Sequence, residues 1–294
     1  MPATIAVQAF NKAEKTTRTL DSIAACRGAD NCNLSILQDG WDGSEHAENY
    51  RHAQAKTTRA IESWISGNLH RFASVCFDHS DRNDGPYKTA ERLLDHAFET
   101  SESVIFSEDD IIFEKDALEW FERAVAHPTF LRPEVWAIAG KSKFFDARQQ
   151  VPLLADISRA LQVAETERLM DRFVYVDVMP SSCFATIRDK WAEFGKTRGS
   201  AKGDGALVRR CRAEGKLCLW PVIARCRDIG MHDPLGWSVR WKGESHPVVK
   251  NNYIVSGMLK GASPQLSELV AGKAALFNEF TLGRNKVEYK RLVF

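Results

Sequence analysis

Three consecutive acids, Glu108, Asp109 and Asp110, stand between the apolar runs VIF and IIF. Burying a charge is costly unless something compensates for it, so acids in this setting need a partner. Clustered carboxylate oxygens suit Mg²⁺ or Mn²⁺, which take further ligands from substrate phosphates, so one or two carboxylates suffice. The triplet therefore predicts a metal that bridges the protein and a nucleotide diphosphate. The alternative is that the acids favour the N-terminus of a helix expected at 115–125.

The acids follow the fourth of five expected strands. Apolar β-type runs predict strands at 4–9, 34–39, 71–77, 103–107 and 134–140, and helical periodicity predicts helices at 16–26, 47–66, 87–99 and 115–125. This alternation predicts an α/β fold with a mostly parallel central sheet flanked by helices.

Polar residues follow three of these strands. Asn11 and Lys12 come after the first, Gln38 and Asp39 end the second, and the acidic triplet follows the fourth. Ligands of parallel sheets bind outside the carboxyl ends of the strands. We therefore expect these three clusters to converge on one crevice.

The second half of the chain has a less regular pattern. We expect helices at 153–170, 187–196, 204–216 and 263–272, and strands at 173–180 and 217–224. Pro221 predicts that the last strand lies at a sheet edge or beside a bulge. Without repeats or a clear linker, residues 1–294 are expected to form one domain.

Composition narrows the class of protein. The 294 residues include 40 basic and 39 acidic side chains with no long basic block, so no nucleic acid or anionic membrane partner is expected. The N-terminus does not resemble a signal peptide, and no run approaches the roughly 20 apolar residues of a membrane span. Seven scattered cysteines without CxxC argue against a zinc or disulfide framework. These features predict a soluble, cytoplasmic protein.

Other catalytic motifs are missing from the sequence. It contains no GxxxxGK[ST] loop, no GxGxxG after a strand and no GxSxG elbow. His232 is the most interesting of the dispersed histidines, although a lone histidine is more often structural.

In order and spacing, the motifs resemble those of GT-A fold glycosyltransferases, and more narrowly the inverting N-acetylglucosaminyltransferase I family (glycosyltransferase family 13). The resemblance covers most of residues 4–235 and implies a donor-binding half at 1–140 and an acceptor-binding half at 141–294. The matching stretches are AFNKAEKTTRTLDSI (9–23), LSILQDG (34–40), YKTAERLLDHAF (87–98), VIFSEDDIIFEKDALEWFERA (104–124), EVWAIAG (134–140), MPSSCFATIRDKWAEF (179–194) and GKLCLWPVIARCRDIGMH (215–232).

The resemblance implies a role for each acid. Asp110, the last acid of this DXD-type motif, would coordinate Mn²⁺ or Mg²⁺, and Asp109 and Glu108 would contact the ribose and the sugar of a UDP-sugar. Asp39 would contact the uracil. Lys12 stands where the family has Arg, and Lys is a less bidentate phosphate partner.

The other implied donor-binding residues are Gln38 of the QD pair, Lys88 of the YK pair, and two residues of a loop that closes over the donor, Arg225 and His232. The resemblance is weakest at the catalytic base. Where the family has two adjacent acids between tryptophans, KGDGALVRRCRAEGK keeps one acid, Asp204, and no tryptophan. Asp204 is the expected base, with Asp233 and Glu244 as alternatives. It could also be a helix cap, and the lost tryptophans imply a different acceptor.

The expected function is metal-dependent, inverting transfer of a sugar, with N-acetylglucosamine as one candidate, from a UDP-sugar to an acceptor hydroxyl. Two alternatives stay open: a non-catalytic module that binds nucleotide sugars, and a sugar-nucleotide nucleotidyltransferase. The latter would need an early Gly-rich loop, and AFNKAEK has no glycine. The acceptor and the oligomeric state are not predicted by the sequence.

Overall fold

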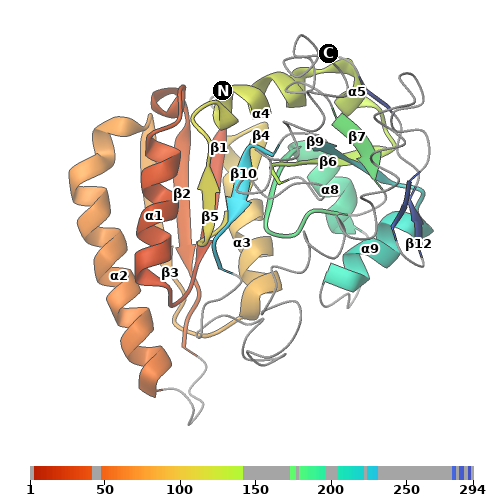
Figure 1. Cartoon of the computed structure of the whole chain (residues 1–294). Helices are drawn as coiled ribbons and strands as arrows, with labels where there is room; N and C mark the ends of the chain where they lie inside the picture. Colours follow the sequence, from red (N-terminus) through yellow and green to blue (C-terminus); the bar gives the residue numbers. More distant parts are fainter. Residues whose placement is uncertain are drawn as a thin grey trace, which may run out of the picture.

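A computed structural model describes residues 3–41, 48–141, 173–176, 179–196, 204–221, 224–230, 280–282, 285–287 and 291–292. The protein has an α/β fold built on a nine-stranded sheet with helices packed against it (Figure 1). The strand order is β13-β7-β9-β6-β8-β4-β1-β2-β3.

The sheet is mostly parallel. Its strands are β1 (Thr4–Ala9), β2 (Asn33–Gln38), β3 (Ser74–His79), β4 (Ser103–Glu108), β6 (Val135–Ala139), β7 (Phe173–Val176), β8 (Cys183–Ile187), β9 (Leu217–Pro221) and β13 (Arg291–Leu292). Pairing is parallel within β4-β1-β2-β3 and between β6 and β9. Because β8 is antiparallel to both β4 and β6, and β7 to both β9 and β13, only β7 and β8 run against the other strands of this sheet.

Two small antiparallel pairs lie outside the large sheet. The strands are β5 (Ile111–Phe113) with β10 (Cys226–Asp228), and β11 (Phe280–Leu282) with β12 (Asn285–Val287). The first pair matters for the site, because β5 directly follows the acidic triplet and β10 comes from the second half of the chain.

The helices are α1 (Ala13–Ala24), α2 (Glu48–Asn68), α3 (Gly85–Thr100), α4 (Ala117–Ala126), α5 (Pro128–Leu131), α8 (Arg188–Lys196) and α9 (Asp204–Ala213), with 3-10 turns η1 (Ala29–Asn31) and η3 (Leu69–Arg71). α3 packs against β1, β2 and β4, whereas α1 packs against α2 and β5. Within the described ranges, no helix is long and apolar enough to cross a membrane.

The central strands are buried because the sheet is covered. All five residues of β6 are buried, as are the four central residues of β4. Such near-continuous apolar strands are typical of parallel sheets with helices on their faces. β3 differs because it is an edge strand. Its first four residues alternate between exposed and half-buried, and its last two are exposed. The core thus lies around β4, β1 and β6, next to the acidic triplet.

The five strands and four helices expected in the first half are confirmed, with ends displaced by a few residues. β5, β8 and β10 were not expected, and β5 and β10 are too short to give a periodic signal. The expected helices at 153–170 and 263–272 lie outside the described residues.

One of the two alternatives expected from Pro221, an edge position, was wrong. β9 lies between β6 and β7, so it is not an edge strand. Pro221 is its last residue, opposite Phe173, and a proline at a strand end is tolerated because few ladder hydrogen bonds are lost there. The other alternative, a strand beside a bulge, agrees with the register shift between Val135 and Ala137 of β6, which lies opposite the start of β9.

Gly140, directly after β6, gives a first prediction. A Cβ there would lie 2.8 Å from each of Cys183 Sγ, Cys226 Sγ and a ring carbon of Phe121. These neighbours are buried, so Gly140→Ala is expected to lower the free energy of unfolding by about 1–3 kcal/mol through overpacking. Urea denaturation measures this, and Gly67→Ala, which has open space around it, is the control. Equal losses in the two variants would contradict the expected overpacking.

Candidate functional site

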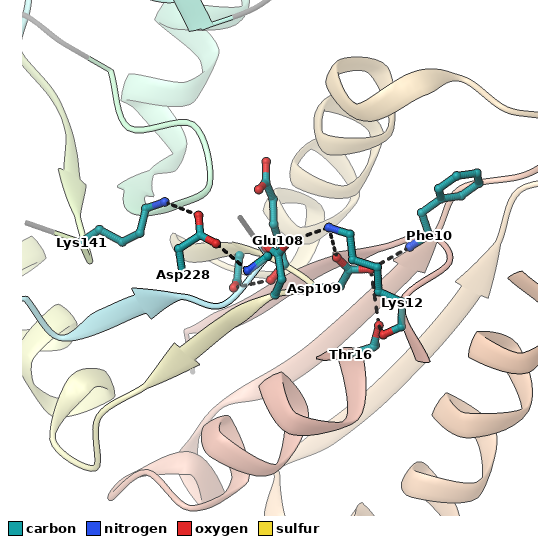
Figure 2. A network of polar contacts seen from close by, with 10 residues as sticks. Phe10, Lys12, Thr16, Glu108, Asp109, Lys141 and Asp228 are labelled. Atoms are coloured by element: carbon teal, nitrogen blue, oxygen red, sulfur yellow. Dashed lines mark hydrogen bonds and ion pairs between the residues drawn. The ribbon is translucent and has the colours of Figure 1, made fainter. Parts of the chain in front are cut away.

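The acidic triplet lies where the carboxyl ends of β1 and β4 meet. β4 pairs with β1 in parallel, with Glu108 opposite Gln8, so both strands end at the same edge of the sheet. Asp109 and Asp110 form the turn that leads into β5, and Lys12 immediately precedes α1. The fold therefore brings Lys12 to the carboxylates, as Figure 2 shows.

Lys12 is the cation that partners the triplet on one side. Its Nζ lies 2.5 Å from Asp110 Oδ2 and 3.5 Å from Asp109 Oδ1, and only 17% of its side chain is exposed. Burial alone would lower the pKa of Lys12, but the charges of Asp109 and Asp110 raise it well above the usual value. Lys12 is therefore charged.

Asp109 is held by the segment that follows β1. The backbone N–H of Phe10 donates to Asp109 Oδ2 at 3.1 Å, and the Thr16 hydroxyl donates to the same oxygen at 3.4 Å. Asp109 is buried. These contacts fix the position of its carboxylate.

A second ion pair lies on the other side of the triplet. Lys141, directly after Gly140, places its Nζ 3.1 Å from Asp228 Oδ2, and the other oxygen of Asp228 accepts from the N–H of Gly230 at 2.8 Å. The Ile229 N–H donates to the backbone carbonyl of Asp110 at 2.8 Å. In Figure 2, Glu108 lies between this pair and Lys12.

Glu108 is a half-buried acid in a negative environment. Burial, and then the nearby charge of Asp110, raise the pKa of Glu108 to about 8. Lys141 and Lys12 oppose this shift. An additional cation nearby would favour the ionised form of Glu108.

Asp110 has a buried carboxylate oxygen without a partner among the described residues. Asp110 is 5% exposed, and its Oδ1 is buried without a hydrogen-bond partner among the described residues. Burial raises the pKa of Asp110, and Lys12 opposes the shift. An unsatisfied buried carboxylate oxygen is costly, and a hard cation is a suitable partner for it.

The donor set fits a cation held by one or two carboxylates, with the remaining ligands supplied by a substrate. Within the described ranges, no three His, Cys, Asp or Glu side chains are arranged to hold a metal ion by themselves. The site carries four carboxylates, those of Glu108, Asp109, Asp110 and Asp228, against the two ammonium groups of Lys12 and Lys141. When all six groups are ionised, the site has two net negative charges, which one divalent cation would balance.

Gln38 and Asp39 lie at the neighbouring strand end but are occupied within the fold. Gln38 Nε2 donates to the carbonyls of Phe10 and Gln54, and Gln38 Oε1 accepts from Thr58. Asp39 Oδ1 accepts from the N–H groups of Gly40 and Asp84, and Asp39 Oδ2 accepts from that of Gly85. The contact of Asp39 with a nucleobase stays a prediction.

The remaining expected donor-binding residues that the structure describes are Lys88 and Arg225. Lys88 is exposed on α3. Arg225 is buried, with Nε 3.0 Å from Asp116 Oδ2 and its guanidinium 5.6 Å from the centre of the Trp120 ring. Because Cys226 pairs with Phe113 and Asp228 with Ile111, Arg225 precedes the end of the β5–β10 pair that is remote from the triplet.

The expected catalytic base cannot be placed against the triplet from the described residues. Asp204 is the first residue of α9, a position that is compatible with both a helix cap and a catalytic base. Its side chain is not described. His232, Asp233 and Glu244 lie outside the described residues.

Sequence reasoning missed Lys141 and Asp228. Lys141 stands at the end of an expected strand, which is the one signal that could have identified it. Asp228 reaches the site through β10, and a three-residue strand gives no pattern from which to predict this.

Comparisons with known proteins give little further information. No protein-family model matches the chain, and no curated protein matches it. Among solved structures, S. aureus TarS is similar over 50% of this chain and 22% of the TarS chain, with 14% sequence identity and a TM-score of 0.33. The matched part is thus about a fifth of TarS. The assignment of a function therefore rests on the residues of the site.

Proposed function

We propose that this protein is a GT-A type glycosyltransferase that moves a sugar from a UDP-sugar to an acceptor hydroxyl with inversion at the anomeric carbon. N-acetylglucosamine is one candidate sugar. The observation that carries the proposal is the site at the carboxyl ends of β1 and β4, where Lys12 faces Asp109 and Asp110 and one buried oxygen of Asp110 has no partner among the described residues.

In this proposal the donor diphosphate lies over the triplet. Asp110 would hold a divalent cation, Mn²⁺ or Mg²⁺, together with phosphate oxygens of the donor. Such a cation, when bound, supplies stabilisation of the negative charge on the departing diphosphate. The ammonium group of Lys12 would also contact the phosphates, and Asp109 would bind the ribose. Glu108, which is half-buried, would contact the sugar.

Asp204 is the proposed general base. As the acceptor oxygen forms its bond to C1 of the sugar, the hydroxyl proton passes to Asp204. The bond between C1 and the phosphate oxygen breaks on the opposite face, and its electron pair leaves with UDP. Attack opposite the leaving group inverts the anomeric configuration, through a state with oxocarbenium character.

Asp204→Asn separates this step from donor binding. The variant is expected to lower turnover by about 10²–10⁴-fold, the usual contribution of a general base, with UDP affinity unchanged. Steady-state release of UDP and calorimetric binding of UDP measure the two quantities. Unchanged turnover would remove Asp204 from the mechanism, and Asp233→Asn and Glu244→Gln would then identify the base.

The proposal as a whole is tested by incubating the full chain and Mn²⁺ with a panel of UDP-sugars, including UDP-N-acetylglucosamine. Release of UDP, at least slowly to water, is the expected result. Metal-dependent UDP binding without turnover on any donor or acceptor would favour a non-catalytic binding module. Formation of a UDP-sugar from UTP and a sugar phosphate would instead indicate a nucleotidyltransferase.

A further inference from the structure

Lys141 lies at the same edge of the sheet as the triplet, although it follows a different strand. Gly140 N–H donates to the carbonyl of Cys183, and Glu108 N–H donates to that of Ser182. The start of β8 thus holds the ends of β4 and β6 together. Lys141 comes from β6 and Glu108 from β4, so a ligand on the triplet would lie within reach of both.

The Lys141–Asp228 ion pair is expected to add little to the stability of the fold. Each side chain is 26% exposed, and partly exposed ion pairs contribute little to stability. Lys141 does not neutralise Glu108 by a direct contact, because its described ion-pair partner is Asp228. Burial alone would lower the pKa of Lys141, but the charges of Asp228 and Glu108 raise it above the usual value. A charged lysine is thus held beside the acids with part of its surface open.

Asp228 fixes the direction of this lysine. One of its oxygens contacts Lys141, and the other accepts from Gly230 N–H in the segment that crosses the triplet. An ammonium group has three N–H donors. Within the described residues one of them is directed to Asp228, which leaves donors for a ligand.

We propose that Lys141 binds a phosphate of the nucleotide diphosphate, on the side of the triplet opposite Lys12, and that Asp228 is its positioning residue. This inference rests on the proposed function and names a donor-binding residue for the same site. The ligand chemistry is a phosphate oxygen, for which a lysine is a suitable point charge. The buried Oδ1 of Asp110, which has no hydrogen-bond partner among the described residues, is an independent sign that the triplet takes a ligand.

The test compares UDP with uridine, which lacks the diphosphate, by calorimetry on the full chain with Mn²⁺. Lys141→Met is expected to weaken UDP binding by about 10- to 100-fold, as for loss of a charge-assisted hydrogen bond, and to leave uridine binding unchanged. Lys141→Arg should retain most of the UDP affinity, and Asp228→Asn should lose less than Lys141→Met. Lys115→Met, at an exposed position, is the matched control for charge removal.

Thermal unfolding checks that the variants are folded, and Lys141→Gln, which can keep a hydrogen bond to Asp228, replaces Lys141→Met if that variant is not. Equal UDP affinity in the wild type and in folded Lys141 variants would overturn the role of Lys141 and leave the proposed function standing. An equal loss of uridine and UDP binding would also overturn it, because the effect would not be on the phosphates. Failure of the wild type to bind UDP would overturn the proposed function, and this inference with it.

Discussion

Asp110→Asn is expected to reduce UDP-sugar turnover by at least about 10²-fold, the scale on which the loss of one electrostatic contact to a developing charge acts. The substitution keeps the shape of the side chain but removes the negative charge that would hold the cation. Because Asp109 remains beside Lys12, the fold should persist. Steady-state release of UDP measures the loss, and the variant should also lose the dependence on Mn²⁺.

Asp81→Asn is the matched control for this variant, because Asp81 is an exposed acid in the loop before α3. It should keep wild-type turnover. If Asp110→Asn kept wild-type turnover and the same Mn²⁺ dependence, the metal role of Asp110 would be wrong, and the unpartnered oxygen would need another explanation.

Lys12→Met is the second variant with a large expected effect, which is a loss of folding stability. Removing one partner of a buried ion pair leaves uncompensated charge, which costs about 3–5 kcal/mol. Here the ammonium faces Asp109 and Asp110, both buried. We expect the free energy of unfolding in urea to fall by about 3 kcal/mol, toward the low end because some of the Lys12 side chain is exposed.

Mn²⁺ distinguishes a ligand site from a purely structural ion pair. In Lys12→Met, a divalent cation can take over the compensation of the carboxylates, so added Mn²⁺ should restore part of the lost stability and stabilise this variant more than the wild type. Lys56→Met, on the exposed face of α2, is the control. Its free energy of unfolding should equal that of the wild type, both with and without Mn²⁺. Destabilisation of Lys12→Met with no response to Mn²⁺ would indicate that the pair only closes the fold.

The first half of the fold was predictable because its strands other than β3 are buried on both faces and its helices are amphipathic. Each such element gives a continuous or periodic apolar pattern, as in TIAVQA of β1 and YKTAERLLDHAFE of α3. The approach of Lys12 to the triplet followed from the rule that parallel strands end at one edge. The contact of Lys12 with Asp110 bears out that expectation.

What could not be predicted depends on contacts between distant segments. Asp228 enters the site only because β10 pairs with β5, and both strands have three residues. The internal position of β9 is set by its neighbours β6 and β7, whereas the local signal of Pro221 left an edge or a bulge open. Gln38 lies at a strand end, as expected, but whether its amide meets a ligand or the carbonyls of Phe10 and Gln54 is decided by the packing of α2.

The most direct measurement of the central claim is calorimetric titration of UDP into the full chain, in Mn²⁺ and again with the metal removed by EDTA. If the edge formed by β1 and β4 binds a nucleotide diphosphate through Asp110 and a cation, UDP should bind at least about tenfold more tightly with Mn²⁺, and Asp110→Asn should abolish that difference. UDP binding that is undetectable, or equally tight in Mn²⁺, in EDTA and in Asp110→Asn, would contradict the account.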